Sequence, residues 1–419
     1  MNSKINNLLN ELINLHPKYI DLSLIRLNKL LKKLGNPHLD LPNTIHIAGT
    51  NGKGSIQKFI RNILVSNGHS CDAYISPHLT KFNERIVLNN KNVSNTKLYE
   101  TLKFVKKINN NLPITFFEIT TAVAFVLFQR SNSDFLILET GLGGRLDATN
   151  TVSKKLCSII TPISYDHEEF LGKTIKKITK EKLGIVKNSD FILISKQKKE
   201  VKEYIKKNLS KTNNVYFYGD NYKVDGLKNN KFIFKYFKEK ILMSQPKLNG
   251  FHQIENASVA LAFSKIMNEK KLKLNFKKIN KSIKETVWPG RLEIIKYLNK
   301  KIILDGSHNI DGAKQLNQFL KIKKIKPVVL FGMLNNKKLK NFLEIIRKQI
   351  KEVLAIKIPD EKNSFETSEI DEKCKLLAIS CLKIKDVNEL LKYIKNSDEK
   401  IYLVTGSLYL VGKIRNRFL

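Results

Sequence analysis

The sequence predicts an α/β protein of two domains, each built on a mainly parallel β-sheet. Short runs rich in β-branched residues alternate with longer amphipathic stretches, which is the pattern of strands wrapped by helices. The series restarts after Trp288-Pro289-Gly290, where a proline and a glycine break both kinds of element. A chain of 419 residues is also too long for one ordinary core. We therefore expect domains at residues 1–288 and 289–419.

Nine apolar runs are the expected strands, five in the first domain and four in the second. In order they are TIHIAGT, CDAYIS, DFLILET, CSIITPIS and FILIS, then KIILDGS, PVVLFGM, EVLAIKI and KIYLVTG. Residues 336–351 are an expected helix of the second domain. Residues 196–240 are rich in Lys and Asn and alternate only weakly, so we expect a peripheral hairpin there.

The first expected strand runs into a glycine-rich turn, Gly49-Thr50-Asn51-Gly52-Lys53-Gly54-Ser55, and then into a helix. In such a turn, backbone N–H groups converge on phosphate oxygens, a lysine adds positive charge, and the helix N-terminus adds its dipole. The spacing departs from G-x-x-x-x-G-K-[ST], because position 47 is Ile and Gly54 precedes Ser55. A phosphate-binding loop is the prediction, and a purely structural turn is the alternative.

Three further strands end in polar residues that serve no packing purpose. Ser76 follows CDAYI, Glu139 closes DFLIL, and Asp166-His167 follows SIITPIS. The carboxyl ends of parallel strands share one edge of a sheet, where ligands bind. A hydroxyl, a carboxylate and an imidazole beside the loop predict a Mg²⁺ site completed by water and nucleotide oxygens. Taken singly, each could be a cap, a solvated strand end or a core-edge histidine.

The net charge of +37 suggests a polyanionic partner, but the distribution of the charge argues against one. Only nine of the 75 basic residues are Arg, and the lysines are spread over nearly every segment. Nucleic-acid surfaces are concentrated and contain arginine. We expect a solvated basic surface and no nucleic-acid partner.

Cysteine usage and hydropathy indicate a cytoplasmic protein. Cys71, Cys157, Cys374 and Cys381 form no C-x-x-C pair and are expected to be reduced core residues. The longest apolar stretch, 122–128, is too short to span a bilayer, and the first residues lack the apolar region of a signal peptide. We expect a soluble, cytoplasmic monomer with no membrane partner.

Ten motifs together resemble the folylpolyglutamate synthase and dihydrofolate synthase group of the Mur-ligase superfamily. They cover nearly the whole chain, and in order they read IAGTNGKGS, YISPHLTKFNERI, TFFEITTAVAF, ETGLGGRLDATN, ISYDHEEFLGKT, EKLGIVK, GFHQIENA, WPGRLE, LDGSHN and TGSLYLVG. The resemblance implies a P-loop-containing parallel-sheet domain followed by a smaller Rossmann-like α/β domain. It also implies ATP and Mg²⁺ as cofactors.

The resemblance assigns roles at the nucleotide. It implies that Lys53 and the loop amides bind phosphates, and that Ser76, Glu139 and His167 are ligands of Mg²⁺. Lys182 matches a position that is carbamylated in many members and supports a second Mg²⁺, although a surface lysine is the plain alternative. Lys53, Lys182 and His167 are the implied catalytic residues. Asn256 matches a position near the adenine, with a surface helical residue as the alternative.

In the second domain, Arg291, Asp305 and His308 match positions that contact the nucleotide across an interdomain cleft. The alternatives are a linker salt bridge for Arg291 and a helix cap for Asp305. Arginine usage favours function, because Arg85, Arg145 and Arg291 fall inside motifs of a chain that otherwise prefers lysine. Asn335-Asn336 stands where the family often has an acidic residue, so a contact there is in doubt.

The implied reaction transfers a phosphoryl group from ATP to a carboxylate, followed by attack of an amine. The implied substrates are dihydropteroate or a folate, and L-glutamate. The segment HPKYIDLSLIRLNKLLKKLG and the TFFE motif look like the bifunctional enzymes. On that basis four residues match a pterin pocket: Thr115, Phe117, Asp147 and Ala148. Phe117 could equally be a core aromatic.

Three other functions stay open. A folylpolyglutamate synthase without the dihydrofolate synthase activity is the closest. A Mur ligase for a nucleotide-linked cell-wall precursor would need a further domain ahead of the loop, and the loop already begins at Gly49. A nucleic-acid-stimulated P-loop ATPase is the alternative that the charge suggests.

Overall fold

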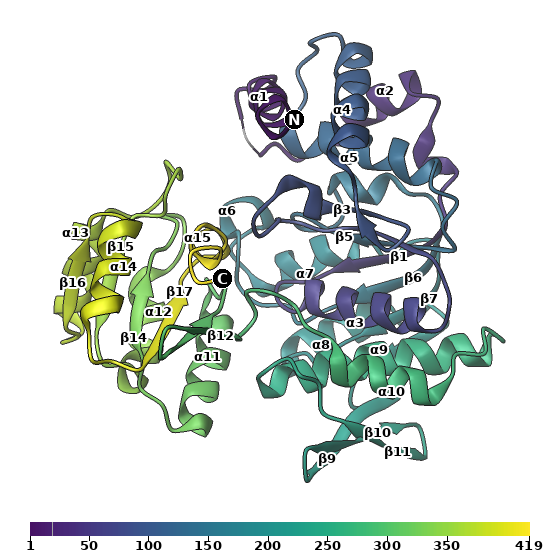
Figure 1. Cartoon of the computed structure of the whole chain (residues 1–419). Helices are drawn as coiled ribbons and strands as arrows, with labels where there is room; N and C mark the ends of the chain where they lie inside the picture. Colours follow the sequence, from purple (N-terminus) through teal and green to yellow (C-terminus); the bar gives the residue numbers. More distant parts are fainter. Residues whose placement is uncertain (19) are drawn as a thin grey trace. The chain divides into compact units, whose positions relative to one another are not determined.

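Two large sheets organise the chain, and each belongs to its own compact unit in the computed structural model, which describes residues 1–18 and 20–419 (Figure 1). The first unit comprises Met1–Gln245 and Glu255–Glu285, and the second comprises Pro246–Ile254 and Thr286–Leu419. Both sheets are mainly parallel and are covered by helices, so the predicted fold class is confirmed. The division at residues 1–288 and 289–419 stays a prediction.

The first unit is built on an eight-stranded sheet in the order β4-β3-β2-β5-β1-β6-β7-β8. In this spatial order, every neighbouring pair between β2 and β8 is parallel. The β2–β3 and β3–β4 pairs at the other edge are antiparallel. The strands are β1 (Asn43–Ala48), β2 (Cys71–Tyr74), β3 (Ile86–Leu88), β4 (Lys91–Asn92), β5 (Phe135–Glu139), β6 (Lys155–Ile160), β7 (Ser189–Ile194) and β8 (Val215–Phe217). Each of the five runs expected to be strands in the first domain overlaps one of these.

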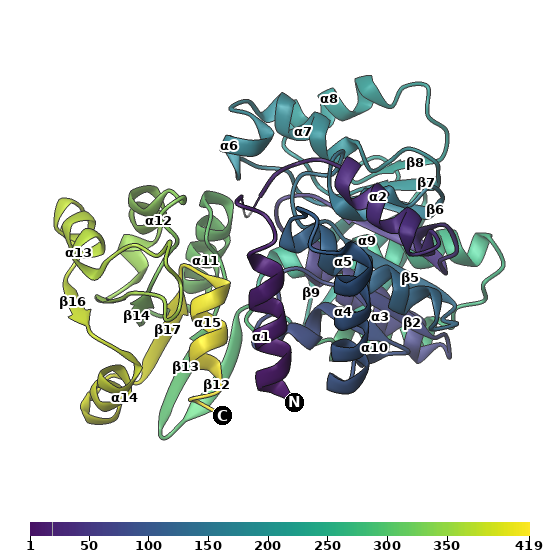
Figure 2. The same cartoon turned by 90° about the horizontal axis from the view of Figure 1, so that it is seen from above.

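Helices cover both faces of this sheet. Figure 1 shows α4 and α5 on one face, and α3 with α10 on the other. From above, α1 runs beside α4 (Figure 2). The helices are α1 (Asn2–Ile13), α2 (Ile25–Lys33), α3 (Lys53–Ser66), α4 (Asn95–Asn109), α5 (Phe116–Gln129), α6 (Glu168–Leu171), α7 (Ile175–Leu183), α8 (Lys199–Asn208), α9 (Phe251–Glu269) and α10 (Phe276–Glu285), with short 3₁₀ turns at Pro37–Leu39, Phe82–Arg85 and Ala148–Thr151.

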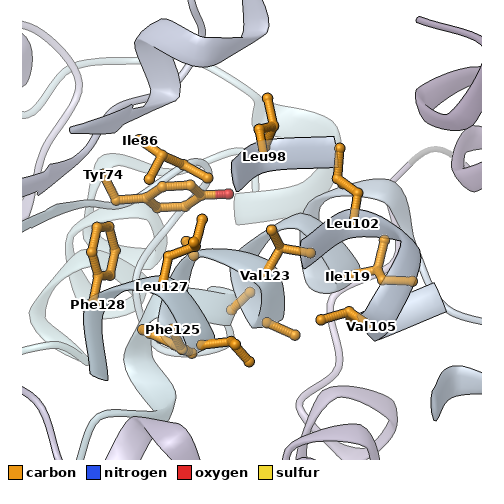
Figure 3. Packing of buried hydrophobic residues seen from close by; sticks show 14 of the residues in the cluster. Tyr74, Ile86, Leu98, Leu102, Val105, Ile119, Val123, Phe125, Leu127 and Phe128 are labelled. Carbon is orange, nitrogen blue, oxygen red and sulfur yellow. The ribbon is translucent and has the colours of Figure 1, made fainter. Parts of the chain in front are cut away.

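The largest described apolar cluster lies where α5 is packed between the sheet and α1, α2 and α4. Helix α5 is almost wholly apolar and is buried nearly all round, as expected of a helix covered on every side. Figure 3 shows Val123 and Leu127 of α5 facing Leu98 and Leu102 of α4, with Tyr74 of β2 beside them. This core fixes the N-terminus of α5, where the TFFE motif begins.

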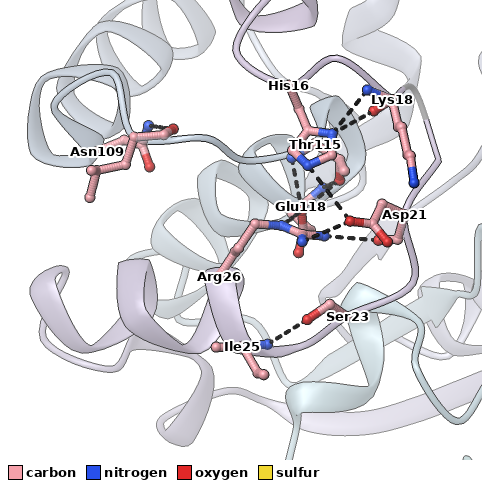
Figure 4. A network of polar contacts seen from close by, with 10 residues as sticks. His16, Lys18, Asp21, Ser23, Ile25, Arg26, Asn109, Thr115 and Glu118 are labelled. Atoms are coloured by element: carbon pink, nitrogen blue, oxygen red, sulfur yellow. Dashed lines mark hydrogen bonds and ion pairs between the residues drawn. The ribbon is translucent and has the colours of Figure 1, made fainter.

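A buried carboxylate holds that N-terminus. Thr115 and Glu118 form a capping box, in which the Glu118 Oε2 atom accepts hydrogen bonds from the Thr115 backbone N–H (2.8 Å) and hydroxyl (2.7 Å). Arg26 of α2 donates from Nε to the same oxygen at 3.1 Å, and from its Nη1 atom to Asp21 at 2.9 Å (Figure 4). The segment around Asp21 is thus tied to α5. Tyr19, in the HPKYIDLSLIRLNKLLKKLG segment, lies outside the described residues.

The expected hairpin at residues 196–240 is wrong in its extent. Its first part forms α8, and VYFYG contributes β8 to the main sheet. The rest belongs to a separate three-stranded antiparallel sheet of β9 (Tyr222–Lys228), β10 (Lys231–Tyr236) and β11 (Glu239–Ser244). Weak alternation hid the division, because β8 is a short edge strand with half-buried side chains.

The second unit has a six-stranded sheet in the order β12-β13-β17-β14-β15-β16, in which only the β12–β13 pair is antiparallel. All four expected strands are present, but the helix expected at 336–351 is shorter, at Leu339–Ile346 (α12), followed by a 3₁₀ turn at Arg347–Gln349. The other elements are β12 (Glu293–Tyr297), β13 (Lys300–Leu304), α11 (Ile310–Lys323), β14 (Val328–Phe331), β15 (Val353–Ile356), α13 (Thr367–Leu376), β16 (Cys381–Ile384), α14 (Val387–Asn396), β17 (Ile401–Thr405) and α15 (Leu408–Arg415).

Helix length and hydropathy test whether any helix of the chain could span a membrane. Over residues 1–18 and 20–419, every helix is too short or too polar to cross a membrane.

Candidate active site

The glycine-rich loop leaves β1 and enters α3, as predicted. Its first residues lie against the end of β6, where the backbone N–H groups of Thr50 and Asn51 donate to the Pro162 carbonyl at 2.9 and 3.3 Å. The Thr50 hydroxyl also donates to the Ser164 carbonyl at 3.1 Å. These contacts hold Thr50 and Asn51 against the end of β6. Helix α3 begins directly after them, at Lys53. The first turn of α3 therefore directs backbone N–H groups toward the loop.

Two glycines permit the turn. Gly49 has φ of 151° and Gly52 has φ of 88°, a region that side-chain-bearing residues rarely adopt. A Cβ atom on Gly49 would lie 1.9 Å from Thr161 Oγ1, and one on Gly52 would lie 2.8 Å from Asn256 Oδ1. The loop is therefore glycine-dependent for both conformation and space. Asn256, predicted near the adenine, lies beside the N-terminus of α3.

Two lysine amines meet at one carbonyl of this loop. Lys53 donates from Nζ to the Gly49 oxygen at 3.3 Å, and Lys182 of α7 donates to the same oxygen at 2.9 Å. The Lys53 amine also lies 4.0 Å from Glu139 Oε1. The structure thus brings together three of the predicted site residues. Two cations near one another at a helix N-terminus form a place that attracts anions.

Burial of Lys182 changes its protonation. The side chain is only 5% exposed, in contrast to the surface lysine that the sequence left as an alternative. Desolvation, and after it the charge of Lys53, lower the pKa of Lys182 to about 7, although Asp166 and Asp147 oppose the shift. A large fraction of this amine is therefore neutral near physiological pH, which is the form that reacts as a nucleophile.

Sheet register places Ser76 and Glu139 at the loop. Glu139 is the last residue of β5, opposite Ile47 of β1, and its side chain is buried. Tyr74 of β2 pairs with Leu138, so Ser76 lies just beyond the same edge, in a cis peptide bond with Pro77. The expected convergence of strand ends is present for these two residues.

His167 follows β6 and begins the short helix α6. It has φ of 52°, which is uncommon for histidine, and its backbone N–H donates to Asp166 Oδ1 at 3.0 Å. The imidazole Nε2 atom lies 3.9 Å from the same oxygen. Asp166 therefore orients His167 and also faces Lys182 electrostatically. No role of its own was predicted for Asp166. Its position after the buried strand β6 is the feature of the sequence that indicates one.

The predicted metal ligands fit a nucleotide-bound Mg²⁺ better than an all-protein cage. Across the described residues, no group of three or more His, Cys, Asp and Glu side chains is gathered in a way that could hold a metal ion. A buried carboxylate, a hydroxyl and an imidazole nevertheless lie on segments that end at the loop. Mg²⁺ is commonly held by one or two carboxylates together with phosphate oxygens and water. The donor set fits that mode of binding.

Asp147 organises the loop that follows β5. Its carboxylate accepts from the Leu142 backbone N–H at 2.8 Å, and from the Thr149 backbone N–H and hydroxyl at 3.0 and 2.6 Å. Burial raises the pKa of Asp147, and these hydrogen bonds oppose the increase. The Thr149 hydroxyl lies 2.8 Å from His46 Nε2. Since Thr149 donates to Asp147, it accepts from His46, a buried residue of β1 that the sequence reasoning missed.

The other predicted pterin residues lie around α5. The Thr115 hydroxyl serves as the N-cap of α5, and Ala148 is buried in the adjacent apolar cluster. Phe117 is half-buried, with its ring 5.9 Å from that of Tyr74. A Cβ atom on Gly141 would lie 2.5 Å from Phe117 Cζ, so Gly141 lies directly against the tip of this ring. Phe117 is therefore a packed aromatic, and its predicted contact with substrate stays a prediction.

The predicted residues of the second unit lie around the end of β13. Asp305 is buried and accepts from the backbone N–H groups of Leu292 and Ser307, both at 3.1 Å. Burial raises the pKa of Asp305, while the Ser307 hydroxyl and the charge of Arg291 lower it. The His308 Nδ1 atom lies 2.9 Å from the Gly306 carbonyl oxygen. These three predicted residues share one neighbourhood within the second unit, and their contact with a nucleotide stays a prediction.

His252 is a buried histidine near Arg291 that the sequence did not reveal. Burial, and after it the nearby charge of Arg291, lower the pKa of His252 to about 4, although a hydrogen bond with Gln315 opposes the shift. The imidazole is therefore neutral at physiological pH, which leaves Arg291 as the cation beside Asp305.

Comparison with known proteins places both units in one family. Residues 47–264 match the Mur ligase middle domain, and residues 290–408 match the Mur ligase, glutamate ligase domain. The dihydrofolate synthase/folylpolyglutamate synthase of Bacillus subtilis is 31% identical over 416 residues, covering 94% of each chain. The solved folylpolyglutamate synthase of Thermotoga maritima is 33% identical with a TM-score of 0.82, covering 99% of this chain and 97% of that one.

The fold is also that of Escherichia coli FolC in complex with ADP, with a TM-score of 0.88 at 24% identity over 99% of this chain and 97% of that one. Family models, curated relatives and solved structures thus agree over nearly the whole length. The chain belongs to the Mur ligase family, within its dihydrofolate synthase/folylpolyglutamate synthase group.

Proposed function

We propose that this protein is an ATP-dependent ligase that joins L-glutamate to the carboxylate of dihydropteroate and of reduced folates. The names of its relatives support the substrates and the two activities. The observation that carries the proposal is the convergence of the Lys53 and Lys182 amines on the Gly49 carbonyl, beside the buried Glu139 carboxylate. A polyphosphate placed there meets two amines, backbone N–H groups and a helix dipole.

The reaction proceeds in two steps. A carboxylate oxygen of the acceptor attacks the γ-phosphorus of ATP, the bond to the bridging oxygen breaks, and ADP leaves with that electron pair. The amine of glutamate then attacks the carbonyl carbon of the acyl phosphate, loses a proton and displaces phosphate. Little of this needs covalent chemistry from the protein, so positioning and charge stabilisation carry the catalysis.

The chain's own residues supply that charge. Lys53 would approach the transferred phosphoryl group from the loop, and Glu139, Ser76 and His167 would hold the divalent cation. Mg²⁺ bound there would offset negative charge on the phosphates. Lys182, once carbamylated, presents a carboxylate where a cation stood, which would suit a second Mg²⁺. Asp166 orients His167 through the contacts described above.

The small-molecule partners follow from this proposal. Asp147 shapes the loop that follows β5, and Phe117 lies against Gly141 of that loop. These two contacts are the basis on which we propose the pterin pocket. Arg291, Asp305, His308 and Asn256 are proposed at the nucleotide. A monomeric state, a cytoplasmic location and the absence of a nucleic-acid partner stay predictions.

The activity is tested with ATP, Mg²⁺ and L-glutamate, supplied with either dihydropteroate or tetrahydrofolate, while phosphate release and ligated product are measured. We expect glutamate-dependent turnover with both acceptors. Turnover with tetrahydrofolate alone would mean that the protein is a folylpolyglutamate synthase without dihydrofolate synthase activity. If neither acceptor works and RNA or DNA instead stimulates glutamate-independent hydrolysis, the assignment fails in favour of the ATPase.

Glu139→Gln and His167→Ala should each lower kcat by on the order of a hundredfold or more, because the metal that offsets phosphate charge loses a ligand. Both variants should keep the far-UV circular dichroism of the parent. Glu169→Ala, which removes an exposed carboxylate two residues after His167, is the matched control and should retain activity. Near-normal turnover of either test variant would remove that residue from the metal site.

Carbamylation of Lys182 should depend on pH around its lowered pKa. The neutral amine adds to carbon dioxide and releases a proton, so the carbamate forms above pH about 7 and is lost as pH falls through that value. With ¹³C-bicarbonate, a carbamate carbon should appear in the NMR spectrum near pH 8 and vanish in Lys182→Arg. Burial also lowers the pKa values of Lys58 and Lys155 to about 8, so any signal left in Lys182→Arg belongs to those amines. An unchanged signal in that variant contradicts the assignment.

A further inference from the structure

Two of the four cysteines, Cys374 and Cys381, lie together in the second unit. Cys374 is on α13 and Cys381 is the first residue of β16, with a tight turn between them. The turn is fixed by a hydrogen bond from the Ile379 backbone N–H to the Cys374 carbonyl at 3.0 Å, and by Ala378 in the left-handed region at φ of 52°. Both side chains pack on the same apolar cluster, and the Cys374 thiol donates a hydrogen bond to Cys381 Sγ.

The two sulfurs differ in access to solvent. Cys374 is fully buried in the apolar cluster of the second unit, whereas Cys381 is partly exposed at the margin of that cluster. Strand β16 is the edge of its sheet and pairs only with β15 among the described strands. A small reagent can therefore reach Cys381 from solvent, while Cys374 lies behind it.

The Cys374 and Cys381 thiols also differ in the direction in which their pKa values are shifted. The hydrogen bond from Cys374 lowers the pKa of Cys381, and an Ala355 backbone N–H and the charge of Lys375 act in the same direction, against burial and Asp371. That same hydrogen bond raises the pKa of Cys374, together with burial. A partly exposed thiol with a lowered pKa beside a buried thiol with a raised pKa is the usual arrangement of an attacking and a resolving cysteine.

We propose that Cys374 and Cys381 form a redox-active dithiol that reacts with low-molecular-weight disulfides to close an intramolecular disulfide. The Cys381 thiolate attacks one sulfur of the reagent, its S–S bond breaks, and one thiolate leaves. The Cys374 sulfur then attacks Cys381 Sγ, expels the second thiolate, and gives up its proton to it. Two cysteine thiols are oxidised, and one external disulfide is reduced to two thiols.

The mixed disulfide itself promotes the second step. While Cys381 is a thiolate, its hydrogen bond retains the proton on Cys374. Once Cys381 is bonded to the reagent, that negative charge is gone, and Cys374 is released to act as the attacking group. All four cysteines were expected to be reduced core residues. The inference concerns a site separate from the ligase centre and does not rest on the proposed function.

Cys71 and Cys157 provide an internal contrast. Both are fully buried, and burial raises the pKa of each thiol. They should react with an external disulfide more slowly than Cys381 by on the order of tenfold or more, because the thiolate is the reactive form.

The test treats the full chain with oxidised glutathione, quenches with acid, and records the intact mass and the linked peptides. The parent should lose two hydrogen atoms, retain no glutathione and yield a Cys374–Cys381 linked peptide that a dithiol reductant reverses. Cys374→Ser should instead accumulate one glutathione on Cys381, and Cys374→Ala should do the same if the serine hydroxyl disturbs the core. Cys381→Ser should show neither product.

Two results overturn the proposal. In the first, the folded parent keeps four free thiols, or stops at a glutathione adduct on Cys381 without closing the disulfide. In the second, glutathione attaches to Cys71 or Cys157 as fast as to Cys381. Circular dichroism of each variant shows whether it is folded when the reaction is measured.

Discussion

Two lysine side chains from different helices end on one backbone oxygen, and the candidate active site depends on that contact. Lys53 lies in the loop itself, whereas Lys182 reaches the Gly49 carbonyl from α7. The carbonyl can accept both because Gly49 adopts a conformation that a side chain would prevent. Burial lowers the pKa of Lys182, and the charge of Lys53 acts in the same direction. The Lys53 amine, the loop N–H groups and the N-terminus of α3 together are a suitable starting state for binding a triphosphate.

The sheet explains why the remaining groups are nearby. Strands β2, β5, β1 and β6 are parallel neighbours, so their carboxyl ends place Ser76, Glu139, the loop and the segment leading to His167 along one edge. The apolar cluster around α5 supports the same unit, and the Glu118 and Arg26 contacts fix the start of the TFFE helix, whose Phe117 lies beside Gly141. Rigid elements thus support the chemistry, and short loops present it.

The sequence predicted what is local or follows from strand order. The loop, Glu139 at its strand end and the parallel sheets could be predicted because glycine patterns and apolar runs are readable within a few residues. Contacts between distant segments could not, such as His46 with Thr149 or Arg26 with Glu118. The use of the Thr115 hydroxyl as a helix cap was also missed, although T-x-x-E is the capping-box pattern. Lys182 appeared to be one surface lysine among many, and only the fold shows that it is buried.

The central claim is that the Lys53 amine and the loop at Gly49 bind the phosphates of ATP. Calorimetric titration of the Lys53→Met variant with ADP and Mg²⁺ tests it most directly, with Lys180→Met, which removes an exposed lysine of α7, as the control. Losing a charge-assisted phosphate contact should weaken binding by on the order of tenfold or more in Lys53→Met, and the control should bind as the parent does. Parent-like affinity in a folded Lys53→Met protein would contradict the account and place the phosphates elsewhere.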